Sequence, residues 1–192
     1  MLTTPFDLEA GDAYLRWREH KLAQAITHID ELTVEVKNPA ALTTAEREAL
    51  LSRCRRSNMA IYATRTAVDE QGVQRLGTQL GLLRLDANWL ADDQGISRIA
   101  VSNGDGPRQA YIPYTDRAIK WHTDGYYNPP ERRIRGMILH CVQPAAQGGE
   151  NRLLDHEITY LMLRDADVEF VRALSAPDAM TIPERTDEHG VA

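Results

Sequence analysis

Residues 121–125, Trp-His-Thr-Asp-Gly, constrain the fold of this chain more than any other stretch. His122 and Asp124 stand two residues apart, and in a β-strand such residues point to the same face. One face of a short strand would then present an imidazole nitrogen beside a carboxylate oxygen. These are two of the three ligands of the 2-His-1-carboxylate set, which holds non-haem iron(II) with open coordination positions. The stretch therefore predicts a strand that carries a metal site.

Length and charge limit the kinds of protein that this chain can be. Its 192 residues correspond to one domain. A formal net charge of −6 argues against a nucleic-acid partner and against an anionic membrane. Two cysteines without a CxxC pair, and an N-terminus without signal-peptide features, favour a cytoplasmic location. The basic residues Arg53, Arg55 and Arg56 are interpreted as the solvated side of a helix.

The first half of the chain has the pattern of a mixed, mainly helical scaffold. Thr43 is followed three residues later by Glu46, which is the capping-box signature of a helix N-terminus. Gly81 stands where glycine usually ends a helix. Helices are predicted at residues 8–28, 43–56 and 69–80, and short strands at 33–36 and 59–63. We therefore interpret residues 1–90 as the N-terminal scaffold of a single domain spanning 1–192.

The second half alternates short apolar or extended segments with turns. Strands are predicted at residues 96–102, 111–114, 118–124, 134–142 and 151–155. Two helices are expected within about 156–174, with Asp155 capping the first and Asp165 the second. Short strands at close spacing suggest a jelly roll. The predicted class is therefore α+β: N-terminal helices followed, over residues 91–192, by a jelly roll with an inserted helical segment.

Three motifs follow one another in this half: His122-Thr123-Asp124-Gly125-Tyr126-Tyr127, Leu139-His140-Cys141 and Gly148-Gly149-Glu150. In this order they resemble the TauD/TfdA family of Fe(II)- and 2-oxoglutarate-dependent dioxygenases. The γ-butyrobetaine hydroxylase branch is the most similar version. The resemblance covers about residues 110–175 and implies a double-stranded β-helix, a jelly roll with the metal held in its mouth.

The resemblance also implies an activity and a first set of site residues. His122 and Asp124 correspond to iron ligands, so Fe(II) and 2-oxoglutarate are the expected cofactors. The implied reaction hydroxylates a small-molecule substrate with O2 and releases succinate and carbon dioxide. Asn151 follows Gly-Gly-Glu, where many relatives carry threonine or serine, and its amide is a candidate contact for 2-oxoglutarate.

Four further residues are candidates for contact with the substrate. Two are aromatic neighbours of the proposed ligands, and two precede the ligands in positions where relatives often contact substrate. They are Asn103, Tyr114, Trp121 and Tyr126. Ordinary packing is the alternative role for aromatic side chains beside a strand.

The third metal ligand is not evident in the sequence. The family places a distal histidine, followed by a 2-oxoglutarate-binding arginine, well beyond the inserted helices, and no such pair follows Asp124. His140 is interpreted as a core histidine and His156 as a surface or capping residue. His189 is the last histidine and has no arginine after it. We therefore expect the jelly roll to be incomplete at its C-terminus and the encoded protein to continue beyond Ala192.

Two other functions stay open at this point. A non-catalytic or truncated relative would serve as a binding or structural module, and its exposed sheet edges would favour a homo-oligomer. A cupin-type, metal-dependent isomerase or hydrolase could use His122 together with His140 from a neighbouring strand. The sequence does not identify the substrate.

Overall fold

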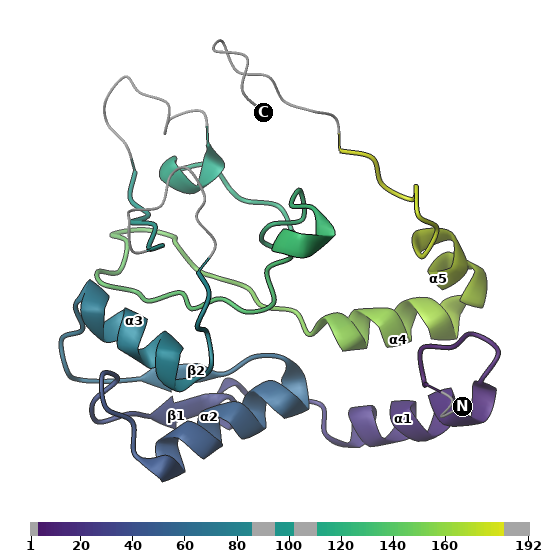
Figure 1. Cartoon of the computed structure of the whole chain (residues 1–192), viewed down its shortest axis with the longest axis horizontal. Coiled ribbons are helices and arrows are strands. Elements are labelled where there is room, and N and C mark those ends of the chain that lie inside the picture. Colours follow the sequence, from purple (N-terminus) through teal and green to yellow (C-terminus); the bar gives the residue numbers. More distant parts are fainter. Residues whose placement is uncertain (1–3, 86–94, 102–110, 183–192) are drawn as a thin grey trace. The chain divides into compact units, whose positions relative to one another are not determined.

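The computed structural model describes residues 4–85, 95–101 and 111–182 (Figure 1). These residues form two compact units. Residues 4–38, 42–66 and 143–182 make up the first, and residues 39–41, 67–85, 95–101 and 111–142 make up the second. The single domain predicted for 1–192, with a scaffold up to residue 90, stays a prediction.

The first unit combines a small parallel sheet with four helices. Its elements are α1 (Gly11–Ala23), β1 (Thr33–Glu35), α2 (Thr44–Ser57), β2 (Ile61–Ala63), α4 (His156–Ala166) and α5 (Val168–Leu174), with the 3₁₀ turn η1 (Ile29–Glu31). β1 and β2 pair in parallel, with Thr33 opposite Ile61. Parallel neighbours need a crossover connection, and α2 supplies it while packing on β1. These helices and strands confirm the predicted ones, with shorter bounds for the first helix and for both strands.

The predicted capping box at the start of α2 is confirmed. Thr43 Oγ1 accepts a hydrogen bond from the Glu46 backbone N–H at 3.2 Å, and Glu46 Oε2 accepts one from the Thr43 N–H at 2.7 Å. Hydrogen bonds from the Thr43 hydroxyl and from the Lys37 and Thr43 backbone lower the pKa of Glu46 to about 2. The carboxylate therefore stays charged and fixes the entry into the helix.

The predicted caps of the two later helices have different outcomes. Asp155 caps α4, because its Oδ1 accepts from the Glu157 N–H at 3.0 Å. Asp165 does not cap α5, so that prediction is wrong. Asp167 takes this position and accepts from the Glu169 N–H at 2.9 Å. Asp165 lies within α4, and its carboxylate is engaged by α1 instead.

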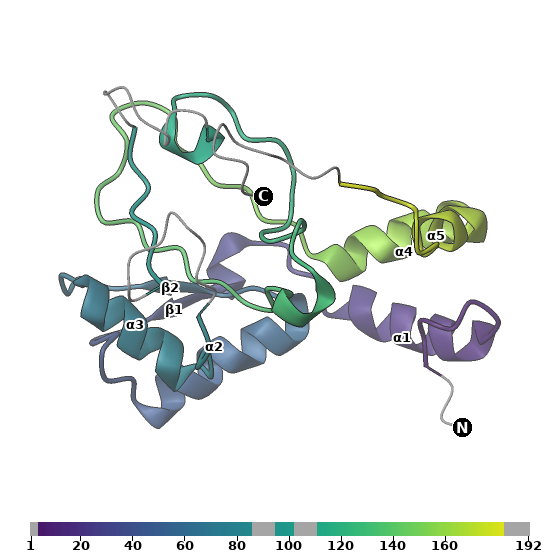
Figure 2. The same cartoon turned by 45° about the horizontal axis from the view of Figure 1, so that its top comes forward.

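Helices α1 and α4 lie side by side, as both views show (Figures 1 and 2). The Tyr14 hydroxyl donates to Asp165 at 2.6 Å, and Arg18 pairs with the same carboxylate at 2.7 Å. Burial and the hydrogen bond to Asp165 raise the pKa of Tyr14 to about 12. Lys21, one turn further along α1, is buried between Asp155 and Glu157 at the start of α4. Polar contacts therefore fix α4 on α1.

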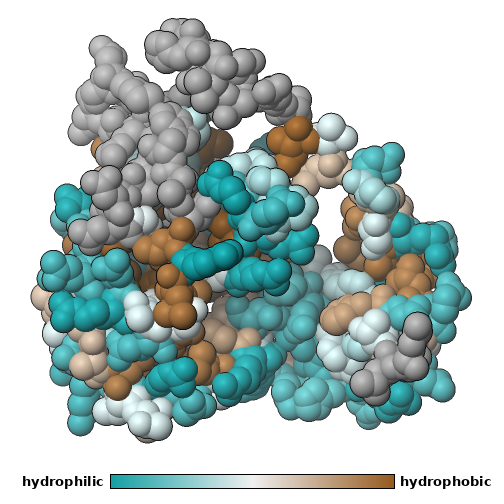
Figure 3. All heavy atoms as spheres, viewed as in Figure 1, coloured by the Kyte–Doolittle hydropathy of each residue, from teal (hydrophilic) through white to brown (hydrophobic). Residues whose placement is uncertain are grey.

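Most of the hydrophobic core of the described residues lies in the first unit. Its buried hydrophobic side chains are Tyr14, Leu32, Val34, Val36, Leu50, Leu161 and Val171. In the second unit the buried hydrophobic residues are Leu76 and Tyr114. Figure 3 shows other hydrophobic side chains exposed between hydrophilic ones. The first unit is thus the better packed of the two.

The second unit contains α3 (Glu70–Gln79) and the 3₁₀ turns η3 (Ile112–Tyr114) and η4 (Pro130–Arg132). Asp69 caps α3 by accepting from the Gly72 N–H at 2.7 Å. Gly81 has a φ of +94° just after the helix, which is the left-handed conformation expected of a helix-ending glycine. The predicted third helix and its end are therefore confirmed.

Among the described residues from 95 to 182, no β-strand is found. The strands predicted at residues 118–124, 134–142 and 151–155 lack the ladder of backbone hydrogen bonds that defines a strand. In the strand predicted at 111–114, residues 112–114 form η3 instead, because Pro113 fixes its own φ and has no N–H for a ladder. The jelly roll stays a prediction that rests on the resemblance.

Among the described residues, each helix is too short or too polar to cross a bilayer.

Candidate metal centre

His122 and Asp124 lie in a loop of the second unit. His122 Nε2 is 3.7 Å from Asp124 Oδ1, and the two side chains are 42% and 45% exposed. Two atoms that bind one ion at about 2.0–2.2 Å each can be at most about 4 Å apart. The two side chains can therefore share one ion, and a further ligand can reach them from solvent.

A hydrogen bond fixes the tautomer of His122. Its Nδ1 lies 2.8 Å from the carbonyl oxygen of Lys120. A carbonyl only accepts, so Nδ1 carries the proton, and in the neutral ring Nε2 presents a lone pair. Nε2 lies 3.7 Å from Asp124 Oδ1, which is also an acceptor, and this distance is too long for a hydrogen bond. A cation placed between the two atoms satisfies both.

Gly125 allows the chain to turn directly after the proposed ligands. Its φ is +65°, and its carbonyl oxygen accepts from the Asn128 N–H at 2.8 Å. A Cβ at this position would lie 2.7 Å from Cδ1 of Ile134. Glycine is therefore required here both by the backbone conformation and by the close approach of Ile134.

Replacing Gly125 by alanine should destabilise the second unit and weaken metal binding at His122 and Asp124. The left-handed conformation costs a residue with a Cβ about 1–2 kcal/mol, and the displacement of Ile134 adds to this. Gly148→Ala is the matched control, because Gly148 has the same φ of +65° and no atom within 4 Å of the added Cβ. Urea unfolding and metal titration of both variants measure the difference. If Gly125→Ala and Gly148→Ala lowered the stability equally, the close approach of Ile134 to Gly125 would not contribute to the loss.

The predicted substrate contacts that the structure describes differ in their exposure. Trp121 and Tyr126 are exposed, and Tyr126 packs edge-on against Tyr127 with ring centroids 5.4 Å apart. Tyr114 is buried in its own unit, an environment that favours packing. Asn103 lies outside the described residues. Exposed aromatic side chains thus flank the proposed ligands on both sides in sequence.

Asn151 belongs to the first unit, where it is exposed after the Gly148-Gly149 turn. Its Nδ2 donates to the Gly149 carbonyl oxygen at 3.4 Å. This long contact leaves the amide available to a ligand. The structure thus brings His122 and Asp124 together in the second unit, whereas Asn151 belongs to the first unit.

The third ligand is not found in the part of the chain that the structure describes. Those residues contain no group of three histidine, cysteine, aspartate or glutamate side chains that could hold a metal ion. His140 is half-buried, and His156 is the first residue of α4. His189 lies outside the described residues.

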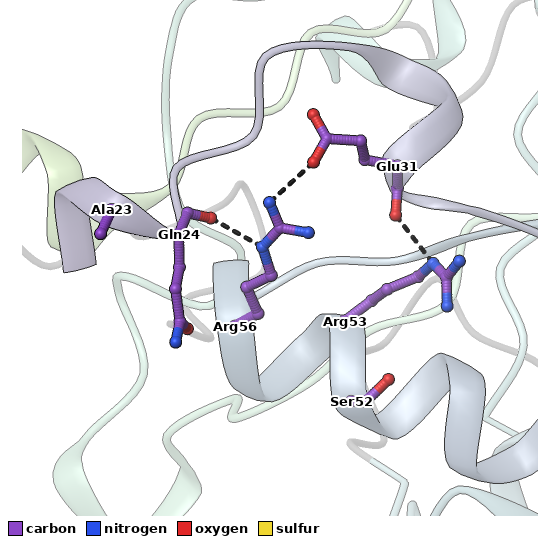
Figure 4. A pocket seen from close by; sticks show the side chains of 6 residues that line it. All are labelled: Ala23, Gln24, Glu31, Ser52, Arg53 and Arg56. Atoms are coloured by element: carbon purple, nitrogen blue, oxygen red, sulfur yellow. Dashed lines mark hydrogen bonds and ion pairs between the residues drawn. The ribbon is translucent and has the colours of Figure 1, made fainter. Parts of the chain in front are cut away.

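The structure also contains a pocket that the sequence did not predict. It lies in the first unit, has a volume of about 550 Å³, and is lined by Ala23, Gln24, Glu31, Ser52, Arg53 and Arg56 (Figure 4). The interpretation of the basic residues as solvated holds for Arg55, whose side chain is 68% exposed. Arg53 and Arg56 are only partly exposed, and both donate to backbone carbonyls. Their spacing of three residues, which places both on one helix face, was the available signal.

An imidazole and a carboxylate that can share one cation define a candidate metal-dependent protein. A comparison with protein families matches residues 20–191 to the sequence model described as "Taurine catabolism dioxygenase TauD, TfdA family". Because this match spans most of the chain, the protein belongs to the TauD/TfdA family, whose members are Fe(II)- and 2-oxoglutarate-dependent dioxygenases with a double-stranded β-helix. Comparisons with curated proteins and with solved structures gave no match. The family resemblance is confirmed, and the γ-butyrobetaine hydroxylase branch stays a prediction.

Proposed function

We propose that this protein is an Fe(II)- and 2-oxoglutarate-dependent oxygenase that hydroxylates a small molecule with O2, releasing succinate and carbon dioxide. One observation carries the proposal: His122 Nε2 and Asp124 Oδ1, both acceptors when the ring is neutral, lie 3.7 Å apart. Membership of the family supports it. The order of the three motifs favours an enzyme similar to γ-butyrobetaine hydroxylase.

The donor set suits iron(II), because imidazole nitrogen and carboxylate oxygen are the ligand types of the facial triad. His122 and Asp124 would hold the ion, and the Lys120 carbonyl would orient the ring through Nδ1. When bound, the iron supplies the redox chemistry that couples decarboxylation of 2-oxoglutarate to hydroxylation. Together, these three residues would hold His122 Nε2 and Asp124 Oδ1 close enough to bind the same ion.

Other residues would orient the organic reactants. The Asn151 amide can donate to a carboxylate, which suits a contact with 2-oxoglutarate. Trp121 and Tyr126 are exposed on either side of the proposed ligands and would contact the substrate. Asn103 and Tyr114 stay as further proposed substrate contacts.

Turnover and binding measured together test this proposal. The purified chain, supplied with Fe(II), 2-oxoglutarate, O2 and a panel of small quaternary-ammonium and carboxylate compounds, should form succinate only when metal and O2 are both present. Calorimetry should show one Fe(II) site per chain. A chain that binds Fe(II) without forming succinate would support the non-catalytic alternative. A chain that binds no metal would contradict the proposed site altogether.

A further inference from the structure

The pocket of the first unit lies between the end of α1 and the C-terminal half of α2 (Figure 4). Arg56 Nε donates to the Gln24 carbonyl oxygen at 2.7 Å, and Arg56 Nη2 pairs with Glu31 Oε2 at 2.7 Å. Arg53 Nε donates to the Glu31 carbonyl oxygen at 2.8 Å, and Arg53 Nη1 donates to the Ala49 carbonyl oxygen at 3.0 Å. Each guanidinium group is therefore held by two contacts, three of the four to backbone carbonyls and one to the Glu31 carboxylate.

Each guanidinium group keeps donors that these contacts do not use. Nη2 of Arg53 and Nη1 of Arg56 have no hydrogen-bond partner among the described residues. Arginine carries five N–H donors in a rigid fork. The Arg56 side chain is 33% exposed, so its remaining donors are accessible to a ligand. Because both side chains are already held in place, a ligand would lose little free energy in ordering them.

The pocket is positively charged although the chain as a whole is acidic. Two guanidinium groups stand against one carboxylate, that of Glu31, whereas the whole chain has a net charge of −6. Hydrogen bonds from the Thr27 backbone and from the Arg56 side chain lower the pKa of Glu31 to about 2. Thr27, His28 and Arg56 together occupy this carboxylate. Glu31 thus orients Arg56 and leaves a net positive charge in the pocket.

We propose that this pocket binds a small molecule through an oxyanion group, either a carboxylate or a phosphate monoester. The guanidinium fork matches the oxygen spacing of both groups. Gln24 and Ser52 also line the pocket. A volume of about 550 Å³ accommodates a molecule larger than the anion alone and is within the usual range for small-ligand sites. The pocket is built from residues other than the proposed iron ligands.

Anion titrations of the full chain test this site. Inorganic phosphate and acetate, added separately at constant ionic strength and followed by calorimetry and by NMR of backbone amides, should each saturate one site. Tighter binding of phosphate would identify a phosphate monoester as the ligand class, and tighter binding of acetate a carboxylate. Arg53→Gln and Arg56→Gln should each weaken binding roughly tenfold or more, as expected for the loss of a charge-assisted hydrogen bond. His122→Ala should bind as tightly as the wild type.

Arg55→Gln is the matched control, because it removes the same charge from the same helix at a side chain outside the pocket. It should change the affinity by less than about twofold, as a screened surface charge does. Arg56→Lys keeps the charge but lacks the fork, so it should weaken binding while thermal unfolding stays close to that of the wild type. Equal losses in the Arg53, Arg55 and Arg56 variants would show non-specific attraction to a basic helix. Linear, unsaturated titrations with both anions would also overturn the proposal.

Discussion

His122→Ala is expected to abolish iron binding at the candidate centre and, with it, succinate formation. The variant removes the Nε2 atom that lies 3.7 Å from Asp124 Oδ1, which leaves the Asp124 carboxylate as the one proposed ligand. Loss of an outer-shell partner typically weakens metal binding about 10–100-fold, and loss of a direct ligand should exceed this range. Isothermal titration with Fe(II) under anaerobic conditions measures the affinity, and succinate formation measures the activity.

Two further variants make this test specific. Asp124→Asn keeps the shape of the side chain but removes its charge, so it should also lose most of the affinity. His20→Ala removes an exposed histidine from α1 in the first unit and should leave both readouts unchanged. If His122→Ala bound Fe(II) as tightly as the wild type and still formed succinate, the ligand assignment would be wrong. If the wild type itself formed no succinate, the proposed function would fail whatever the ligands are.

The sequence predicted those elements whose determinants are local. The Thr43–Glu46 capping box, the Asp155 cap and the glycine after α3 each depend on residues within a few positions of one another. Local hydrogen bonds of this kind decide where a helix begins or ends almost independently of the rest of the chain. The helices of the first 85 residues were therefore found close to their predicted positions.

Elements that depend on distant partners were predicted less well. Asp165 and Asp167 are both plausible helix caps by local sequence. Asp165 is engaged instead by Tyr14, 151 residues away, and no local pattern reports that contact. Strands likewise need a partner, so an extended, apolar segment such as 134–142 does not by itself form one.

The candidate metal centre falls between these two cases. The proximity of His122 and Asp124 was predictable because they stand only two residues apart in sequence. The reason given for it was a shared strand face, whereas the structure shows a loop that turns at Gly125. The third ligand depends on the tertiary fold, and neither the sequence nor the described residues assign it.

Lys21→Met should cause the largest loss of stability of any substitution considered. Lys21 is only 6% exposed, and its Nζ pairs with Asp155 at 2.7 Å and with Glu157 and donates to the Arg56 carbonyl oxygen at 2.8 Å. Methionine keeps the apolar stem but leaves two largely buried carboxylates without their cation. Because these carboxylates are partly reached by solvent, we expect a loss of about 2–3 kcal/mol, somewhat less than the roughly 3–5 kcal/mol of a fully buried pair. For a chain of this size that lowers the melting temperature by roughly 5–10 °C.

The pH dependence of unfolding provides a second readout for the same variant. Burial lowers the pKa of Lys21, but the hydrogen bonds to Asp155 and Glu157 outweigh it, so the pKa is raised above its usual 10.5. The stabilisation is therefore fully present below about pH 10.5, the pKa of the unfolded chain, and is lost as the pH rises through the higher folded-state pKa. Wild-type stability should fall in this alkaline range, and that of Lys21→Met should fall less.

Controls for Lys21→Met separate the loss of the buried ion pair from a general loss of positive charge on α1. Arg18→Met removes a cation from the same helix, but Arg18 and its partner Asp165 are both exposed, so a much smaller loss is expected. Adding Asp155→Asn and Glu157→Gln to Lys21→Met should recover much of the stability, because asparagine still caps α4 and no buried charge is left unpaired. If the triple variant were less stable than Lys21→Met, the penalty would not come from uncompensated carboxylates. Urea unfolding of the four proteins at neutral pH decides between these outcomes.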